Sequence, residues 1–259
     1  SEKYNVYFLQ DGWAEQNPDE WWAAVCKGLK TLFEEKGIHP EEIIGIGIAG
    51  QSWSAIPVDR NGHPLAKNPI WLDVRAASIC ETLSKKIGTE RIFALCGNPL
   101  KPQYTTGKIC WFKQNLFEVY RSAAKFLQSN SFIGFKLTGA MSQDLSQCYG
   151  LHCFDIRKGC WDVSMCKDFG IDPELLPEIV LCHQIIGQVT TEASIQTGLL
   201  TGTPVVAGGL DAACGTLGAG VIHEGQTQEQ GGQAGGMSIC LSEVHADSRL
   251  ILSNHVVPD

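Results

Sequence analysis

The sequence contains no long, uninterrupted apolar run among its 259 residues. Its longest weakly polar stretch, residues 199–222, is rich in glycine and is broken by Pro204 and Asp211. A helix that spans a membrane needs about 20 consecutive, predominantly apolar residues. We therefore expect no membrane partner for this chain.

Positive charge is also scarce. The chain has 20 Lys and Arg against 28 Asp and Glu, which gives a formal net charge of −8. Nucleic-acid binding requires clustered Lys and Arg. We therefore expect no nucleic-acid partner. A local phosphate site stays compatible with this charge, because glycine amides or a bound metal can outweigh a diffuse acidic surface.

The eleven cysteines include no C-x-x-C pair. Their densest group, from Cys148 to Cys166, fits neither zinc-binding nor redox spacing, and His152 beside it adds only one candidate ligand. We interpret the cysteines as reduced thiols that pack as small apolar side chains. Reduced thiols indicate a cytoplasmic protein.

Two common nucleotide-binding motifs are missing. No Gly-Lys-Ser or Gly-Lys-Thr follows a glycine-rich loop, and no G-x-G-x-x-G segment opens a helix after a strand. A P-loop or Rossmann assignment therefore has no support.

A glycine-rich region surrounds Asp211. The β-branched run at residues 203–207 predicts a buried strand, and Gly208 and Gly209 allow a sharp turn at its end. Asp211 then lies after a strand and before a helix of small residues, where open α/β sheets place their chemistry. The alternative interpretation is a simple helix N-cap, which Asp favours.

A second glycine cluster lies at residues 231–236, just before the apolar run at 237–241. Glycine-rich bends expose backbone N–H groups that can bind phosphate oxygens. The sequence therefore pairs one carboxylate with one candidate phosphate loop.

Helical and extended patterns alternate along the chain, which predicts an α/β fold. Asn17 and Pro18 predict the start of a helix that ends at Gly37. Further helices are expected at residues 76–86, 89–95, 106–115, 119–127 and 130–138, and strands at residues 4–9, 43–48 and in a hairpin from 55 to 65.

Several segments resemble the FGGY family of carbohydrate kinases. Residues 201–220, TGTPVVAGGLDAACGTLGAG, resemble the region that holds the family's catalytic aspartate. Other segments match in the same order: residues 12–18, Gly50-Gln51, the W-x-D-x-R pattern at 71–75, the T-x-x-K-I-x-W-F-x-Q-N pattern at 105–115, residues 137–139, Trp161-Asp162 and residues 170–177.

The resemblance implies a ribonuclease-H-like fold of the actin and hexokinase type. It also implies ATP and Mg²⁺ as cofactors and phosphorylation of a hydroxyl on a small-molecule sugar or polyol, with a ketose favoured. Asp211 then matches the catalytic general base, a substrate contact and a metal contact. The other matched positions are Gln51, Ser52, Trp53, Trp71 and Gln103 for sugar binding and Gly232, Gln233 and Ala234 for a phosphate of the cofactor.

Some matched positions depart from the family pattern. Ser52-Trp53 stands where members that act on xylulose carry Met-His, and Ala212 stands in place of Asn or Gln. Gln103 replaces an aromatic, Met, Gly or Ser. These differences argue against xylulose or glycerol as the preferred substrate. Trp71 has a core interpretation as well, and Asp73 with Arg75 is expected to be a structural ion pair.

In the resembled family a phosphate loop precedes the position of Ser1 and an adenine-binding domain follows that of Asp259. We therefore expect residues 1–222 to be a sugar-binding domain that lacks its first strands, and residues 223–259 to open the nucleotide-binding domain. The chain alone is then an inactive fragment, and a homodimer is a compatible assembly. The alternative is a non-catalytic carbohydrate-binding domain or a pseudokinase.

Overall fold

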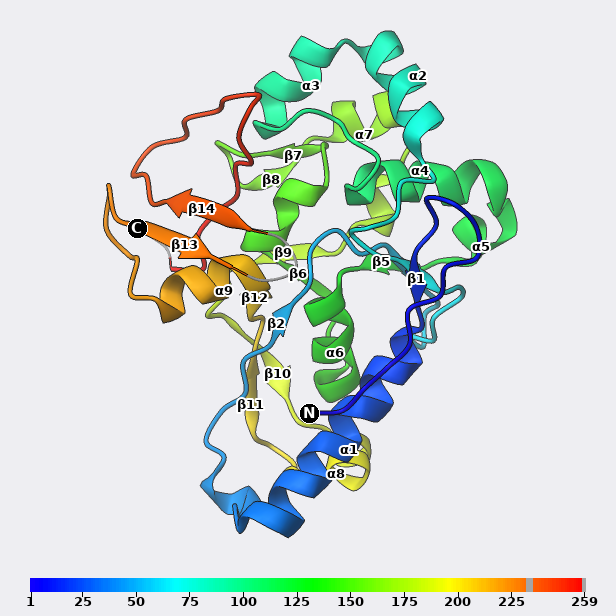
Figure 1. The fold of residues 1–259 in the computed structure, drawn as a ribbon. Helices are drawn as coiled ribbons and strands as arrows, with labels where there is room; N and C mark the ends of the chain where they lie inside the picture. The colour runs from blue at the N-terminus through cyan, green and yellow to red at the C-terminus, as the bar shows by residue number, and fades with distance from the viewer. Residues whose placement is uncertain (232–234, 258–259) are drawn as a thin grey trace.

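A computed structural model describes residues 1–231 and 235–257 of the chain (Figure 1). The α-helices are α1 (Pro18–Lys36), α2 (Ala77–Ile87), α3 (Thr89–Cys96), α4 (Thr105–Asn115), α5 (Phe117–Ser122), α6 (Ser129–Thr138), α7 (Val163–Phe169), α8 (Thr191–Thr197) and α9 (Asp211–Gly218). Short 3₁₀ helices cover Pro40–Glu42, Leu145–Gly150 and Pro173–Leu175. None of the helices in the described ranges is long and apolar enough to cross a membrane.

The strands are short. They are β1 (Glu15–Gln16), β2 (Ala49–Gly50), β3 (Ile56–Val58), β4 (Asn68–Pro69), β5 (Lys125–Leu127), β6 (Ser142–Asp144), β7 (Phe154–Asp155), β8 (Cys160–Trp161), β9 (Glu178–Val180), β10 (Ile185–Gln188), β11 (Pro204–Val206), β12 (Gly209–Leu210), β13 (Thr227–Gln230) and β14 (Gly236–Ile239). Helices and strands alternate, so the predicted α/β class is confirmed.

Helix α1 has the predicted start and end. The Asn17 side chain accepts a hydrogen bond from the backbone N–H of Asp19, Pro18 occupies the first turn, and Gly37 ends the helix in the left-handed region. The buried Trp22 of α1 donates its indole N–H to Gln196 Oε1 in α8 at 2.6 Å. This contact joins the two helices that lie together in Figure 1.

One long-range parallel pairing crosses the molecule. Ile46 bridges Val205, and further along Gly209 pairs with Ala49 and Leu210 with Gly50. The strand predicted at residues 43–48 is therefore displaced, because regular strand geometry begins only at Ala49 in β2. The segment from Ile46 onward still runs beside β11 and β12.

The opposite edge of this segment is open. Gly45 and Gly47 are exposed, and within the described residues their backbone groups make no hydrogen bond. A hollow of about 320 Å³ lies at this side, with Ile48, Trp21 of α1 and Ile133 of α6 among its lining residues. The edge therefore has backbone groups free to accept a further strand.

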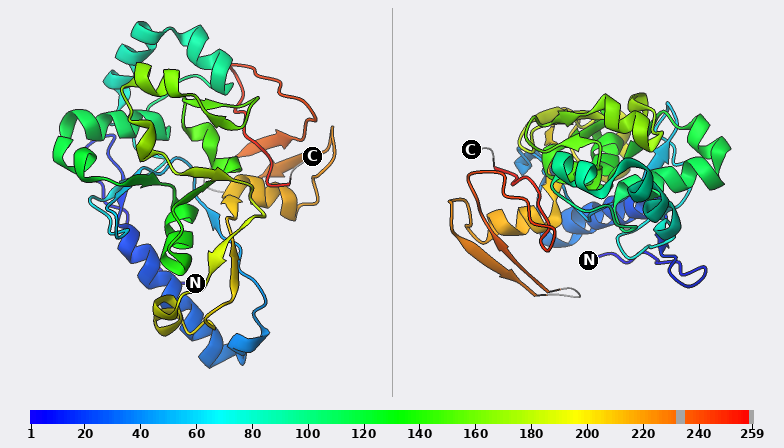
Figure 2. Two further views of the ribbon diagram at one scale, coloured as in Figure 1. Left: turned by 180° about the vertical axis from the view of Figure 1, so that it is seen from behind. Right: turned by 90° about the horizontal axis from the view of Figure 1, so that it is seen from above.

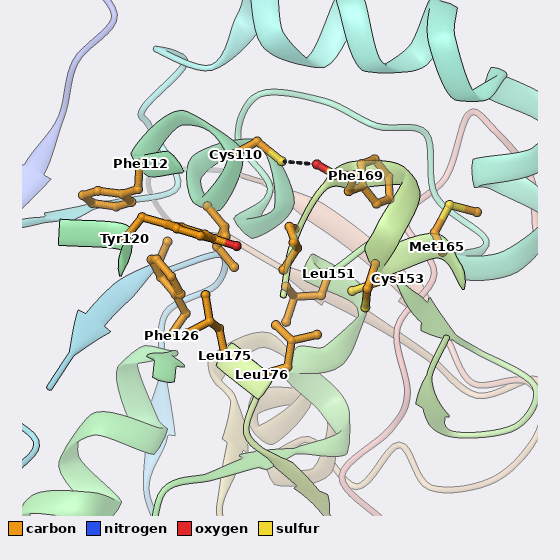
Figure 3. Packing of buried hydrophobic residues seen from close by; sticks show 14 of the residues in the cluster. Cys110, Phe112, Tyr120, Phe126, Leu151, Cys153, Met165, Phe169, Leu175 and Leu176 are labelled. Atoms are coloured by element: carbon orange, nitrogen blue, oxygen red, sulfur yellow. Dashed lines mark hydrogen bonds between the residues drawn. The ribbon is translucent and has the colours of Figure 1, made fainter. Parts of the chain in front are cut away.

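The largest hydrophobic cluster lies between α4, α5 and α7 (Figure 3). Cys110 and Cys153 are buried in it among aromatic side chains, and Cys110 Sγ donates to the carbonyl oxygen of Phe169 at 3.7 Å. All eleven cysteines are free thiols. Those in this cluster pack as apolar side chains, as the sequence predicted.

Two predicted elements are wrong. Residues 119–127 do not form one helix, because α5 ends at Ser122 and residues 125–127 form β5, which pairs antiparallel with β3. The pairing buries Phe126 and Leu127, and this tertiary gain outweighs local helical pattern. The predicted strand at residues 4–9 is reduced to one bridge, Tyr7 with Glu15.

The C-terminal part forms a separate hairpin and then returns to the body. Strands β13 and β14 pair only with each other among the described residues, and the hairpin lies to one side of the molecule when seen from above (Figure 2). Beyond it, Asn98 Nδ2 donates to the carbonyl of Leu252 at 2.8 Å, and the Leu252 N–H donates to Asn98 Oδ1 at 3.0 Å. These two bonds fix residues near 252 against the body.

We predict that Gly208 is needed for the parallel pairing. Its φ is +70°, and a Cβ there would lie 2.0 Å from the carbonyl oxygen of Ile48. Gly220 has a similar φ of +76° with nothing within 4 Å, so it is a matched control. Gly220→Ala should lower the free energy of unfolding by about 1–2 kcal/mol, the cost of the left-handed conformation. Gly208→Ala should lose about 1–3 kcal/mol more through the clash.

Urea denaturation of both variants measures the difference. Equal losses in the two variants would show that the contact with Ile48 relaxes without cost.

Candidate functional site

Asp211 and Gln51 directly follow the ends of two neighbouring strands. The parallel pairing places Leu210 of β12 opposite Gly50 of β2, and each strand ends there. Asp211 and Gln51 are the residues that directly follow, so the register brings these two predicted site residues together. Figure 1 shows β2 beside β12, with α9 directly after β12. They lie at the carboxyl ends of parallel strands, where ligands bind in open α/β sheets.

Asp211 is the first residue of α9. Its Oδ1 accepts a hydrogen bond from the N–H of the adjacent Ala212 at 2.7 Å, and no side-chain bond caps the helix. The residue is exposed, yet protein surrounds part of its carboxyl group. This partial burial raises the pKa of Asp211, and the Ala212 N–H acts in the opposite direction. The side-chain bond that the alternative N-cap interpretation requires is therefore not formed.

A buried carboxylate supports the strand before Asp211. Ser146 Oγ donates to Asp144 Oδ1 at 2.6 Å and accepts from the N–H of Leu210 at 2.8 Å. Asn130 Nδ2 donates to Asp144 Oδ2 at 2.8 Å. Burial raises the pKa of Asp144, although these hydrogen bonds favour its charged form. Asp144 thus positions β12 from the interior, and no motif in the sequence marks it.

Both the side chain and the backbone carbonyl group of Gln51 form hydrogen bonds. Its side chain donates to Gln16 Oε1 at 2.7 Å, and its carbonyl oxygen accepts from Ser129 Oγ at 2.8 Å and Gln147 Nε2 at 3.1 Å. Because three separate elements contact it, Gln51 has a fixed orientation beside Asp211.

Trp53 has an unusual backbone and an unused donor. Its φ is +58°, the only positive φ of a non-glycine residue in the described ranges. Its ring packs on Tyr104 at 4.5 Å and Tyr149 at 6.0 Å between centroids. Its indole N–H is buried and makes no regular hydrogen bond in the described chain, although it lies close enough to Tyr149 to lower the pKa of that hydroxyl. A bulky residue keeps this conformation only where its surroundings enforce it.

Tyr149 lies near both Ser52 and Asp211. Burial raises the pKa of the Tyr149 hydroxyl, and Tyr104 and the charge of Asp211 raise it further, whereas the nearby Ser52 and Trp53 side chains lower it. Ser52 and Asp211 are therefore both close enough to Tyr149 to affect the pKa of its hydroxyl.

Gln103 and Trp71 complete the predicted sugar contacts. Gln103 Oε1 is buried and has no hydrogen-bond partner within the described residues. Trp71 is partly exposed and belongs to none of the hydrophobic clusters, which argues against its core interpretation. The expected ion pair is present: Arg75 Nη2 lies 2.7 Å from Asp73 Oδ2, and both side chains are buried.

Two aromatic residues beside Trp53, Tyr104 and Tyr149, were not predicted from the sequence. Both are buried in one cluster with Leu210, against which Trp53 packs. Tyr104 directly precedes the motif that starts at Thr105, which was a usable signal, whereas no motif marks Tyr149.

The predicted phosphate contacts Gly232, Gln233 and Ala234 lie outside the described residues. No group of three or more His, Cys, Asp or Glu in the described ranges could hold a metal ion.

Comparison with known proteins identifies the family of the chain. The family model for the "FGGY family of carbohydrate kinases, N-terminal domain" matches residues 1–218. A xylulose kinase of Staphylococcus epidermidis is 30% identical over 261 residues, which cover 100% of this chain and 52% of that protein. The xylulose kinase of Bacillus subtilis is 28% identical over 227 residues, 88% of this chain and 45% of that protein.

The fold is also found in solved structures. The crystal structure of xylulose kinase from Rhodospirillum rubrum matches with a TM-score of 0.92 at 27% identity and covers 99% of this chain and 53% of that one. Glycerol kinase from Plasmodium falciparum matches with a TM-score of 0.81 at 25% identity and covers 92% of this chain and 48% of that one. The chain thus spans about half the length of the relatives it matches.

These neighbours share the actin and hexokinase type of fold, as predicted. With its family match over residues 1–218, the chain belongs to the FGGY family of carbohydrate kinases and contains that family's N-terminal domain.

Proposed function

We propose that the whole protein carrying this chain transfers a phosphoryl group from ATP to a hydroxyl of a sugar or polyol, with a ketose as the substrate class. The observation that carries the proposal is the strand register that sets Asp211 beside Gln51. The names of the relatives, xylulose kinases among them, support the substrate class.

Asp211 suits the part of general base. Phosphoryl transfer depends mainly on positioning and charge stabilisation, and the base only has to take the proton as the hydroxyl attacks the phosphorus. Partial burial raises the pKa of Asp211, which makes its carboxylate a better proton acceptor. The buried bonds through Ser146 to Asp144 hold the strand in front of it.

The unused polar groups fit a hydroxylated substrate. Trp53 and Gln103 each carry a buried polar atom, an indole N–H and an amide oxygen, for which the described chain supplies no regular hydrogen bond. Because both atoms are covered, a side-chain movement on binding would bring them to the substrate, where a sugar hydroxyl can accept from the first or donate to the second. The rings of Trp53, Tyr104 and Tyr149 lie beside these groups and present apolar surface for C–H groups. Ser52 and Trp71 extend the proposed contacts.

ATP and Mg²⁺ fit the remaining part of the site. Mg²⁺ usually binds one or two carboxylates together with phosphate oxygens and waters. Asp211 uses Oδ1 for the Ala212 N–H, and within the described chain no donor contacts its Oδ2, so it can supply one oxygen. When bound, the ion would neutralise charge on the phosphates. We assign the phosphate contact to Gly232, Gln233 and Ala234.

The organisation of the whole protein belongs to the same proposal. Residues 1–222 form its sugar-binding domain, and residues 223–259 begin the nucleotide-binding domain. We propose a cytoplasmic location, because all eleven cysteines are free thiols. A homodimer is the proposed assembly, to be measured by light scattering.

A phosphorylation screen of the full-length protein across pentuloses, hexuloses, polyols and sugar acids would identify the substrate. Xylulose and glycerol belong in it, because Trp53, Gln103 and Ala212 depart from the family pattern. The non-catalytic alternative predicts sugar binding without product from any of them.

In the full-length protein, Asp211→Asn should lower kcat by at least about 10²-fold, because the amide keeps the shape but cannot take the proton. Nucleotide affinity should stay within a few-fold. Asp162→Asn is the matched control: Asp162 also begins a helix, its Oδ1 accepts from the N–H of Met165 at 2.7 Å, and Asn caps equally well. Steady-state kinetics of both variants decide. A near-normal kcat in Asp211→Asn would show that Asp211 has a structural role and is not the general base.

A second prediction concerns the stability of the chain itself. Because the folded state raises the pKa of Asp211 above its ordinary value of 3.8, the folded carboxyl group holds its proton more tightly than the unfolded one. Its contribution to stability is therefore complete below that value and is lost as the pH rises through the raised pKa. Asp211→Asn should be more stable than the wild type at neutral pH and equal to it near pH 3.

Urea denaturation at several pH values measures this difference. If Asp211→Asn were less stable than the wild type at neutral pH, the negative charge of Asp211 would be stabilising the start of α9, and Asp211 would have a structural role.

The chain alone should have no kinase activity. It spans about half the length of its relatives, and orienting nucleotide, metal and sugar can account for about 7–11 kcal/mol of the barrier. A coupled ATP assay on the pure chain tests this, with its Asp211→Asn variant as the control. Steady turnover that depends on Asp211 would disprove the prediction.

A further inference from the structure

Lys108 is an unusual residue for a protein interior. It lies in the first turns of α4, its side chain is fully buried, and none of the salt bridges within the described residues includes it. Lysine is almost never fully buried unless it is paired, because removing an ammonium group from water is costly. An apolar residue of similar length would avoid that cost, so the ammonium group needs another explanation.

The amine is used by two backbone carbonyl groups. Lys108 Nζ donates to the carbonyl oxygen of Trp53 at 2.6 Å and to that of Ile70 at 2.8 Å. Trp53 is the residue with the left-handed backbone, and Ile70 directly precedes Trp71. One side chain therefore joins the two loops that carry proposed sugar contacts, although these loops are far apart in sequence.

The start of α4 makes further contacts to the same place. Thr105 Oγ1 donates to the carbonyl oxygen of Ser54 at 3.1 Å, and the Tyr104 ring packs on Trp53. The residues around Lys108 thus hold the carbonyl groups of Trp53 and Ser54 as well as the Trp53 ring. Together they supply the surroundings that a left-handed tryptophan requires.

We propose that Lys108 is a positioning residue that fixes Trp53 in its left-handed conformation and sets its distance from Trp71, so that the two sugar-binding loops form one preformed surface. The proposal rests on the proposed function for its consequence, but its geometry stands apart from it. Lys108 does not reach the reacting atoms, because two backbone carbonyl groups occupy it in the interior.

The charged groups near Lys108 oppose one another in their effect on its amine. Burial lowers the pKa of Lys108 to about 7, and the Asp73 carboxylate opposes the shift while Arg75 adds to it. The hydrogen-bond acceptors of the amine are the carbonyl oxygens of Trp53 and Ile70.

The test compares Lys108→Met with Lys113→Met in the full-length protein. Lys113 lies on the same helix and also donates to a backbone carbonyl, that of Gly170, but it is exposed and remote from Trp53. For the best substrate of the sugar screen, Lys108→Met should raise KM about tenfold or more with kcat changed less than about threefold, since preformed binding is lost. Lys113→Met should change neither.

A readout independent of activity uses tryptophan fluorescence. Lys108→Met should shift the emission of the protein, and the shift should vanish when both proteins carry Trp53→Phe. Lys108→Arg, which keeps the charge and the donors, should recover part of the emission and of the KM. Where Lys108→Met does not fold by circular dichroism, Lys108→Gln replaces it, because its shorter amide cannot reach both carbonyl groups.

An unchanged KM in the folded Lys108 variant overturns the proposal, and so does an emission shift that persists without Trp53. If the wild type phosphorylates no sugar, the proposed function fails instead. The comparison of tryptophan emission then still tests whether Lys108 positions Trp53.

Discussion

The parallel pairing of residues 46–50 with residues 205–210 is the constraint on which the site depends. It joins segments that are more than a hundred residues apart and brings Asp211 and Gln51 to one edge. Strand ends are precise positions, because a shift of one residue turns every side chain to the other face. Gly208 and the bond from Leu210 to Ser146 both act on this register.

The second constraint is the packing around Trp53. A tryptophan in the left-handed region, a fully buried lysine and an unpaired indole N–H each cost free energy. They occur within one small region, next to the residues that we propose to bind the sugar. The buried Asp73 and Arg75 pair stabilises the neighbouring loop without such unpaired groups.

Local signals in the sequence predicted some of this structure correctly. Asn17, Pro18 and Gly37 define α1 because caps depend on residues within a turn of the helix end. The region around Asp211 could be placed because its glycines and its strand-to-helix order are local as well. Family resemblance added the positions of Gln51, Trp53 and Gln103, which no periodicity would have selected.

What the sequence could not predict depends on partners far along the chain. Residues 125–127 became β5 because β3 lies beside them, and Asp144 supports Leu210 through a serine 64 positions away in sequence. Lys108 stood within a recognised motif, yet its task is visible only when the carbonyl groups of Trp53 and Ile70 converge on it. Long-range hydrogen bonds of this kind leave no pattern in neighbouring residues.

The open edge at Gly45 and Gly47 has a practical consequence for handling this chain. Strand edges with free backbone groups and small, uncharged side chains are templates on which other chains add as further strands. In a concentrated solution of the chain, we expect copies to associate through this edge, next to the hollow lined by Trp21 and Ile48. An extended peptide supplied in excess would compete for the same backbone groups and keep the chains apart.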